Sequence, residues 1–257
     1  MSNYWQQRDR DRLYNKQLGI AEKQLAKEYT RCAKITKEKL IALYDEIMAS
    51  SADGTLIVSD LYKYNRYYEL LNNLNTNLDK LGQKEIAITE EALKTMYMLN
   101  ADLVAGELGF STKVDEEAVK KAINSIWCSD GKHWSSRVWT NKSALQELIK
   151  NGMVDCIARG ASKDEVVRQL MTDMKVGYSQ AERLARTELT YIQNKSCLDK
   201  YAEAGIERYR YLAAHDERTS DICQELDGKV FLLKDASVGT NYPPMHPNCR
   251  STVLAVL

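Results

Sequence analysis

The residues with the clearest chemical potential lie near the end of this sequence, in a proline-rich run. All three prolines of the chain fall between Pro243 and Pro247, within the sequence Pro-Pro-Met-His-Pro-Asn-Cys-Arg. Proline fixes its own φ angle, removes a backbone donor and keeps the preceding residue out of the helical region. We therefore expect a rigid, extended loop that carries His246 and Cys249.

A second set of reactive side chains, His215, Asp216 and Cys223, lies upstream and would meet this loop if the chain folded back. One hypothesis is a structural zinc site, because Cys223, His246 and Cys249 supply two thiolates and an imidazole. His215 or Asp216 would complete its tetrahedron. The sequence favours a second hypothesis, a corner held by hydrogen bonds alone. In it Asp216 accepts from a backbone N–H or from Arg250, and His246 donates to a carbonyl.

The third hypothesis is catalysis. Cys249 or Cys223 would be the nucleophile, His246 the base and Asp216 its orienting group. Arg186 and Glu188 could then serve a transferase with an anionic substrate. The sequence has no Gly-rich phosphate loop, His-Glu-x-x-His or Gly-x-Ser-x-Gly, so this is the weakest of the three. Residues two apart on a helix face different ways, so we expect one of this pair to hold the Asp216 loop.

The composition is that of a folded protein without a membrane-spanning segment. Apolar residues make up 44% of the 257, and no apolar stretch approaches the roughly 20 residues that span a bilayer. The first twelve residues are polar and unlike a signal sequence, so we expect no secretion by the producing cell. The six cysteines are widely scattered, which predicts a reducing compartment and no disulfide framework.

Helical periodicity dominates the chain up to Ala204. From Arg12 to Ala49, apolar residues recur every three or four positions and predict one long amphipathic helix. At about 1.5 Å per residue it would extend on the order of 55 Å, so it needs other long helices or a partner beside it. The next predicted elements are a short strand-like stretch at 55–58 and helices at 59–82, 89–109, from 112 or 115 to 127–131, and 141–159.

Two Ser-x-x-Glu capping boxes, at Ser162 and Ser179, predict two more helices, the first ending at Met174 and the second at Ala204 before Gly205. The stretch that holds Trp127, His133, Trp134 and Trp139 is interpreted as a packing corner that joins two subdomains, not as a ligand platform.

After Gly205 the pattern alternates, with Tyr209 and Tyr211 on one side of a strand. Asp227-Gly228 is a hairpin-type turn signal before a second strand at 229–233, and residues 252–257 form a third. We therefore predict a mainly α fold: a long-helix body with a small C-terminal α+β module carrying a short antiparallel sheet. The predicted regions are 1–110, 111–178 and 179–257, and the last is called the C-terminal module below.

An ordered set of short motifs in this module resembles the phage head morphogenesis family of Mu F-like minor head proteins. The motifs are Ala185-Arg186-Thr187-Glu188, Asp216-Glu217-Arg218-Thr219, Cys223, Leu226-Asp227-Gly228-Lys229-Val230-Phe231 and Pro243-Pro244-x-His246-Pro247-Asn248-Cys249-Arg250. The opening Asn3-Tyr4-Trp5-x-x-Arg8, before a long charged helix, is also similar to that family.

The resemblance implies a minor capsid component of a tailed phage, made in the host cytoplasm and carried in the virion, in the head interior or at the portal vertex. Its implied partners are the portal protein and capsid, and its implied roles are head morphogenesis and DNA delivery. The motif residues to which it points are Arg186, Glu188, Asp216, Asp227, Gly228, Pro244, His246, Cys249 and Arg250. We expect no enzyme, with a small cytoplasmic enzyme or toxin-like transferase as the alternative.

The first helix has a local basic bias although acidic and basic residues are equal in number, 36 each. This bias allows contact with packaged DNA or an acidic partner through Arg8, Arg12, Lys16 and Lys23. A solvated helix face remains the simpler interpretation.

Overall fold

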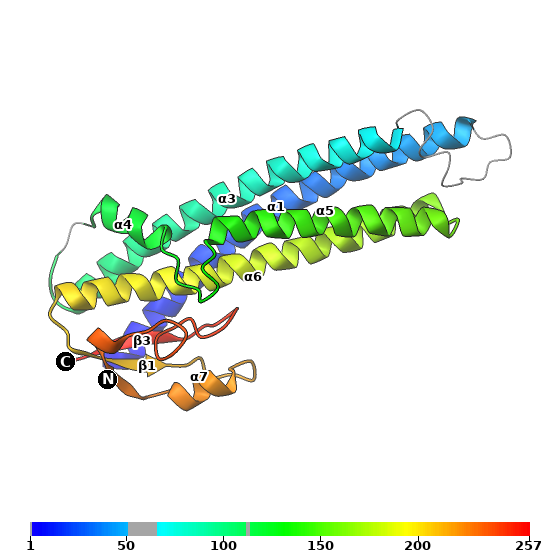
Figure 1. Ribbon diagram of the computed structural model, residues 1–257. Helices are drawn as coiled ribbons and strands as arrows, with labels where there is room; N and C mark the ends of the chain where they lie inside the picture. Colours follow the sequence, from blue (N-terminus) through cyan, green and yellow to red (C-terminus); the bar gives the residue numbers. More distant parts are fainter. Residues whose placement is uncertain (1, 51–65, 112–113) are drawn as a thin grey trace. The chain divides into compact units, whose positions relative to one another are not determined.

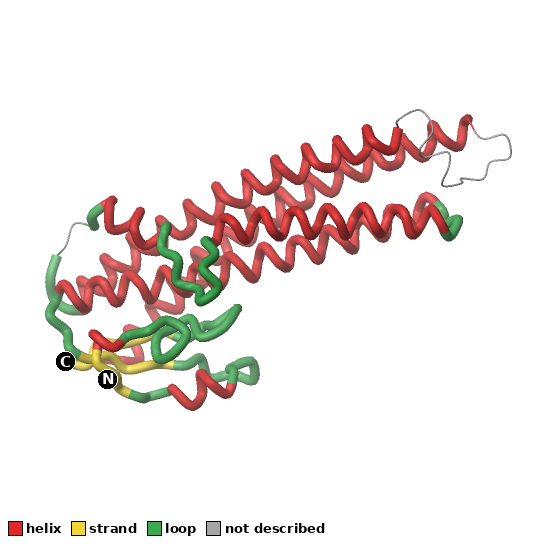
Figure 2. Tube along the Cα trace, viewed as in Figure 1, coloured by secondary structure: helices red, strands yellow, loops and turns green. Residues whose placement is uncertain are grey.

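The computed structural model describes residues 2–50, 66–111 and 114–257. The mainly α fold is confirmed, since 72% of the described residues are helical and a three-stranded antiparallel sheet lies near the C-terminus. Figure 1 shows the order of the elements and Figure 2 separates helix, strand and loop. The predicted strand-like stretch at 55–58, the helix start at 59 or 60 and the alternative start at Thr112 lie outside the described residues.

Three long helices dominate the chain. They are α1 (Ser2–Ser50), α3 (Arg66–Glu107) and α6 (Lys163–Glu203), and α5 (Trp134–Ala158) is the next longest. The single long first helix is confirmed and begins earlier than its apolar periodicity indicated. No helix within the described residues is long and apolar enough to cross a membrane.

Several predicted helix boundaries are wrong; α5, for example, begins at Trp134 and not at residue 141. Gly82 does not end a helix, because α3 runs through it, and Ser179 does not cap one, because α6 runs through that residue. The capping box at Ser162 is confirmed: its backbone N–H donates to Glu165 Oε2 at 2.8 Å, and Glu165 N–H donates to Ser162 Oγ at 3.3 Å. Gly205 follows α6 with a φ of 71°, the left-handed conformation expected after a helix end.

The short helix α4 (Glu116–Ile123) begins after Asp115, whose side chain accepts a hydrogen bond from the Glu117 N–H at 3.1 Å. After it, Trp127 stacks on Tyr191 with ring centroids 5.0 Å apart, and Trp134 is buried with its indole N–H donating to the Ile123 carbonyl. These two tryptophans are packing residues, as expected.

The sheet has the order β2-β1-β3, with both pairings antiparallel. Its strands are β1 (Arg208–Leu212), β2 (Val230–Leu232) and β3 (Thr252–Val256). Tyr209 and Tyr211 face inward, as the alternation predicted. The chain between β1 and β2 is not a tight hairpin, because it contains the helix α7 (Asp221–Leu226); Asp227 and Gly228 follow that helix and lead into β2.

The contacts divide the chain into two compact units, each assembled from separate stretches. The first unit comprises Met1–Lys23, Ile88–Trp134 and Glu182–Leu257, and the second comprises Gln24–Ala87 and Ser135–Ala181. This grouping differs from three consecutive regions, because α1, α3 and α6 each contribute residues to both units. The core of the second unit includes a buried ion pair, with Lys142 Nζ 2.6 Å from Glu85 Oε2.

In the first unit the sheet packs on the last part of α6 (Figure 1). Cys197 and Tyr201 from α6 share a buried apolar cluster with Tyr209 of β1 and Val253 of β3. The N-terminal part of α1 joins the same unit, where the buried Arg10 guanidinium donates to the Val253 carbonyl. Much of the chain between the strands is loop, as Figure 2 shows, so this packing is what positions the loop residues described next.

Candidate functional site

Three of the predicted site residues, Cys223, His246 and Cys249, come together in the C-terminal module. Cys223 lies on α7, and the other two lie on the proline-rich loop that leads into β3. Both cysteines are buried, and His246 is half-buried. Their ligand atoms all lie within 4.8 Å of one another. The proline-rich loop therefore does bring its His and Cys to the upstream cysteine.

Short contacts join these side chains. The Sγ atoms of Cys223 and Cys249 are 3.8 Å apart, and Cys223 Sγ is 3.3 Å from His246 Nε2. Ser220 Oγ also lies 2.8 Å from the same Nε2. The other ring nitrogen, Nδ1, lies 2.8 Å from the Pro247 carbonyl oxygen. Because a carbonyl can only accept, Nδ1 carries the proton of a neutral ring and Nε2 is left as the acceptor.

The two thiols of this contact differ in acidity. The hydrogen bond from Cys249 lowers the pKa of the Cys223 thiol below its usual value, and hydrogen bonds with Ser220 and Tyr211 lower that pKa further. The same sulfur–sulfur contact, together with burial, raises the pKa of Cys249. Cys223 is therefore the more acidic thiol of this coupled pair.

Threonine and asparagine side chains of α6 hold the loop. Thr190 Oγ1 donates to the Cys249 carbonyl at 2.7 Å, and the Asn248 N–H donates to Thr187 Oγ1 at 3.1 Å. Asn194 Nδ2 donates to the Ser251 carbonyl at 3.1 Å. Because these partners lie on one helix and are all buried, the position of Cys249 is set by α6.

The structure places His215 and Asp216 outside this group. The His215 side chain is 74% exposed, and its Nε2 lies 3.4 Å from Asp227 Oδ2. Asp216 instead accepts two hydrogen bonds from the Arg250 guanidinium and one from the Arg218 N–H at 2.9 Å. These donors hold the pKa of Asp216 well below its usual range. The predicted contact between Asp216 and Arg250 is present, and neither His215 nor Asp216 is near enough to be a fourth ligand.

Arg186 and Glu188 do not hold the Asp216 loop, so that prediction is wrong. Arg186 pairs with Glu22 at 2.7 Å and with Glu182 at 2.8 Å. Glu188 is buried and accepts a hydrogen bond from the Trp127 indole N–H at 2.9 Å. The two side chains point to different neighbours, as their spacing on a helix required, and each anchors another segment of the first unit to α6.

Asp227, Gly228 and Pro244 shape the backbone around the site. Asp227 Oδ1 accepts from the Ala213 N–H at 2.8 Å, just after β1 ends. Gly228 adopts a φ of 73° and donates to the Tyr211 carbonyl at 2.9 Å. A side chain at this φ would be strained, so glycine is required here. Pro244 is buried and follows a cis peptide bond.

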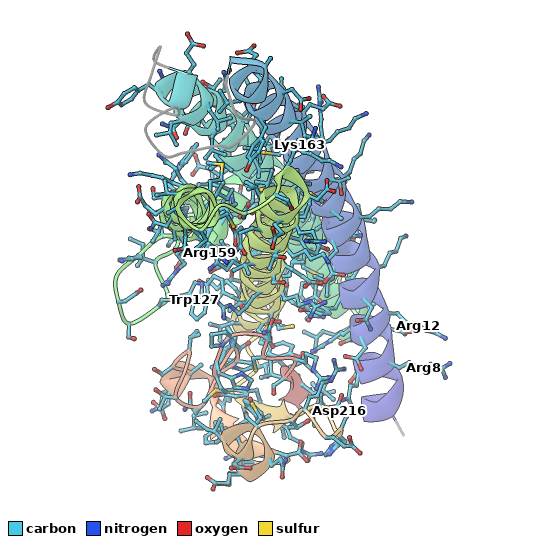
Figure 3. The ribbon with its side chains drawn as sticks, turned by 90° about the vertical axis from the view of Figure 1, so that its right-hand side faces the viewer. Arg8, Arg12, Trp127, Arg159, Lys163 and Asp216 are labelled. Atoms are coloured by element: carbon cyan, nitrogen blue, oxygen red, sulfur yellow. The ribbon has the colours of Figure 1, made fainter. Side chains whose placement is uncertain are left out.

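The basic residues predicted on the first helix, Arg8, Arg12, Lys16 and Lys23, are all exposed. Arg8 and Arg12 project outward from α1, away from the packed interior of the first unit (Figure 3). Arg12 also lies 3.6 Å from Asp9, an exposed pair of little energetic weight.

Comparison with known proteins identifies the module. The family model described as Phage Mu protein F like protein matches residues 147–254. Residues 147–254 belong to the Mu protein F-like family. The match begins within α5 and includes the whole sheet apart from the last residues of β3. The expected phage minor head family is thus confirmed.

Individual relatives match the chain to different extents. The minor head protein GP7 of Bacillus phage SPP1 is 23% identical over 98% of this chain and 87% of its own length. The NAD(+)--arginine ADP-ribosyltransferase EFV of Enterococcus faecalis is 33% identical over 49% of this chain, and an uncharacterized Haemophilus influenzae protein is 24% identical over 45%. The chain spans only 29% and 26% of the length of these two proteins. No solved structure matches it.

Sequence patterns did not assign a role to several residues that surround Cys223, His246 and Cys249. Ser220 precedes α7 and reaches His246, and Tyr211 donates its hydroxyl hydrogen to Cys223 Sγ at 3.3 Å. Thr190 reaches the Cys249 carbonyl across a long sequence separation. The inward face of β1 was recognisable in the alternation, and so was the position of Tyr211, but nothing local indicated which sulfur it would meet.

Proposed function

We propose that this protein is a minor head protein of a tailed phage that is bound at the portal vertex and acts in head morphogenesis and DNA delivery. The observation that carries the proposal is the similarity to a phage minor head protein over 98% of the chain, together with the Mu F-like match of its C-terminal part. The similarity extends through the helical body, so it is not confined to one shared module.

The surface of α1 supports a position next to packaged DNA. Arg8, Arg12, Lys16 and Lys23 expose four cationic groups along one helix in a chain whose total charge is balanced. Cations in such a row can contact successive phosphates without reading sequence, as a protein beside condensed DNA would need to do. The protein would then be made in the host cytoplasm and carried in the head.

The test is the copy number of this protein in purified heads, measured by quantitative mass spectrometry against the major capsid protein. We expect few copies per head, and we expect them to disappear from heads assembled without the portal protein while the major capsid protein remains. An unchanged copy number in heads that lack the portal would contradict portal binding. Complete absence from normal heads would contradict the virion role.

A transferase is the second candidate, because the chain is 33% identical to part of an arginine ADP-ribosyltransferase. The side chains on which a transferase would depend are otherwise engaged. Glu188 is buried against Trp127, Arg186 is paired with two glutamates, and His246 contacts the Pro247 carbonyl where an orienting Asp216 was expected. We therefore expect no enzymatic activity.

Incubation of the purified chain with labelled NAD+ and an arginine-rich polypeptide tests this candidate. The expected result is no label transfer above that of a Glu188→Gln variant. Transfer by the wild type that the variant loses, while circular dichroism shows both proteins folded, would establish the enzyme instead.

A further inference from the structure

The observation that leads beyond the head role is the arrangement of Cys223, His246 and Cys249. These side chains offer two sulfurs and one imidazole nitrogen from two separate segments, α7 and the loop before β3. We propose that they bind one zinc ion, which ties α7 to that loop. The proposal does not depend on the head role.

The distances fit a tetrahedral zinc centre. Zinc–sulfur bonds of about 2.3 Å place two tetrahedral sulfurs about 3.8 Å apart, and a zinc–nitrogen bond of about 2.0 Å places sulfur and nitrogen about 3.5 Å apart. The Cys223 and Cys249 sulfurs are separated by 3.8 Å, and Cys223 Sγ lies 3.3 Å from His246 Nε2. All three ligand atoms lie within 4.8 Å of one another, so adjustment of the side chains can bring them around one ion.

The histidine is oriented for this role. Its Nδ1 proton is directed to the Pro247 carbonyl at 2.8 Å, so the lone pair of Nε2 is free to face Cys223 Sγ, 3.3 Å away. A hydrogen bond of this kind from the non-ligating nitrogen fixes the tautomer and ring orientation of most zinc-bound histidines. The surrounding Thr190 and Thr187 contacts hold the loop backbone in place from the α6 side.

The chemistry of the donor set favours zinc over harder ions. Thiolate and imidazole ligands in a tetrahedral arrangement suit zinc, whereas calcium and magnesium require oxygen ligands. No further His, Cys, Asp or Glu joins the group within the described residues. The fourth position thus falls to a water molecule, and the Ser220 hydroxyl, 2.8 Å from His246 Nε2, is placed to accept a hydrogen bond from it.

The local packing explains what such an ion would add. The apolar cluster around the site has only four buried members, Tyr211, Ala213, Cys223 and Cys249. A helix of six residues, α7, is held to the sheet by this small cluster. Metal ligation is a common way to stabilise a small structure whose core is thin.

The experiment is elemental analysis of the full chain, purified under reducing conditions without chelator after growth with added zinc. We expect about one zinc per chain. Cys223→Ser and Cys249→Ser should each lose most of it. His246→Cys should keep it, because that change exchanges one zinc ligand for another. Cys128→Ser is the matched control, since it removes a thiol of the same unit away from the site and should retain the full content.

A second measurement does not depend on whether the variants fold. The metal-free wild type, titrated with cobalt, should develop a thiolate-to-cobalt charge-transfer band that saturates at one ion per chain. Zinc in the wild type together with this band would support the site. A wild type that holds no zinc and gives no saturable band would overturn it and leave a corner held by hydrogen bonds. Equal zinc in Cys223→Ser, Cys249→Ser and Cys128→Ser would also overturn it.

Discussion

At the scale of single residues, two local features of the backbone decide which side chains meet in the C-terminal module. The prolines fix the loop that carries His246 and Cys249, so only one further segment had to fold onto it. His215 and Asp216 depend on a turn after β1, in which the Thr219 N–H donates to the Asp216 carbonyl at 3.1 Å. That turn directs their side chains away from the sulfurs, and residue types alone do not reveal its direction.

The Asp216–Arg250 pair predicts a pH-dependent contribution to stability. Asp216 has a pKa below its unfolded value, which is about 3.9. Its contribution is therefore fully present above pH 4 and is lost as the pH falls through the lower, folded-state pKa. We expect Asp216→Asn to lower the melting temperature slightly at pH 7, because the pair is exposed, and to lower it less as the pH falls below 4.

Melting curves of the wild type and Asp216→Asn between pH 2 and pH 7 measure this difference. In an Arg250→Gln background the same substitution should have a smaller effect, since its main partner is gone. A difference that stays constant through the acid range would mean that the carboxylate charge does not stabilise the fold.

At the scale of elements, the errors in helix boundaries have a common physical cause. Gly82 was expected to end a helix but lies inside α3, and Gly177 lies inside α6, between the predicted helix end at Met174 and the predicted cap at Ser179. Neighbouring side chains pack closely on both glycines. An added Cβ would lie 2.7 Å from Trp139 Cζ3 at Gly82 and 2.5 Å from Leu145 Cδ2 at Gly177. Such a tertiary contact outweighs local propensity and cannot be seen in a periodicity. The capping box at Ser162 was predictable because it is local.

This packing makes Gly177→Ala a destabilising substitution, although alanine is the better helix former. Overfilling a packed site costs roughly 1–3 kcal/mol, and the gain in helix propensity is at most about 1 kcal/mol. Leu145 is itself buried, so its side chain has little room to move. We expect a net loss of roughly 1 kcal/mol in the free energy of unfolding, measured by urea titration.

Gly19→Ala is the matched control, because it also replaces a helical glycine but has no atom within 4 Å of the new Cβ. It should stabilise the protein by roughly 0.5–1 kcal/mol. Equal effects of the two substitutions would show that close packing does not determine the choice of glycine at 177.

At the scale of the whole molecule, the fold class was predictable and the grouping into units was not. The long periodicities and the change to alternation after Gly205 are local signals, and the structure bears out both. The two units, in contrast, join stretches far apart in the sequence, such as Met1–Lys23 with Glu182–Leu257. Contacts such as that between Arg10 and the Val253 carbonyl decide this grouping, and no spacing rule anticipates them.

The net charge of the protein is balanced, so any attraction to DNA has to come from a local group of cations. The exposed basic residues along α1 are such a group, called the basic row here. If Arg8, Arg12, Lys16 and Lys23 contact phosphates, the logarithm of the binding constant for duplex DNA should fall linearly as the logarithm of the salt concentration rises. Replacing all four with glutamine should reduce that slope by up to about 3.6, at about 0.9 for each cation. Fluorescence anisotropy of a labelled duplex at several salt concentrations measures it.

A second quadruple variant separates a DNA-binding face from general charge. Lys94, Lys120, Lys121 and Lys132 are exposed in the same unit, so their replacement by glutamine changes the net charge equally. If the basic residues of α1 bind DNA, only the α1 variant should show a smaller salt dependence of the binding constant. The reason is that counterion release depends on cations that lie against phosphates and not on total charge. An equal decrease of the salt dependence in both variants would show that the basic residues of α1 form a solvated helix face and not a DNA-binding one.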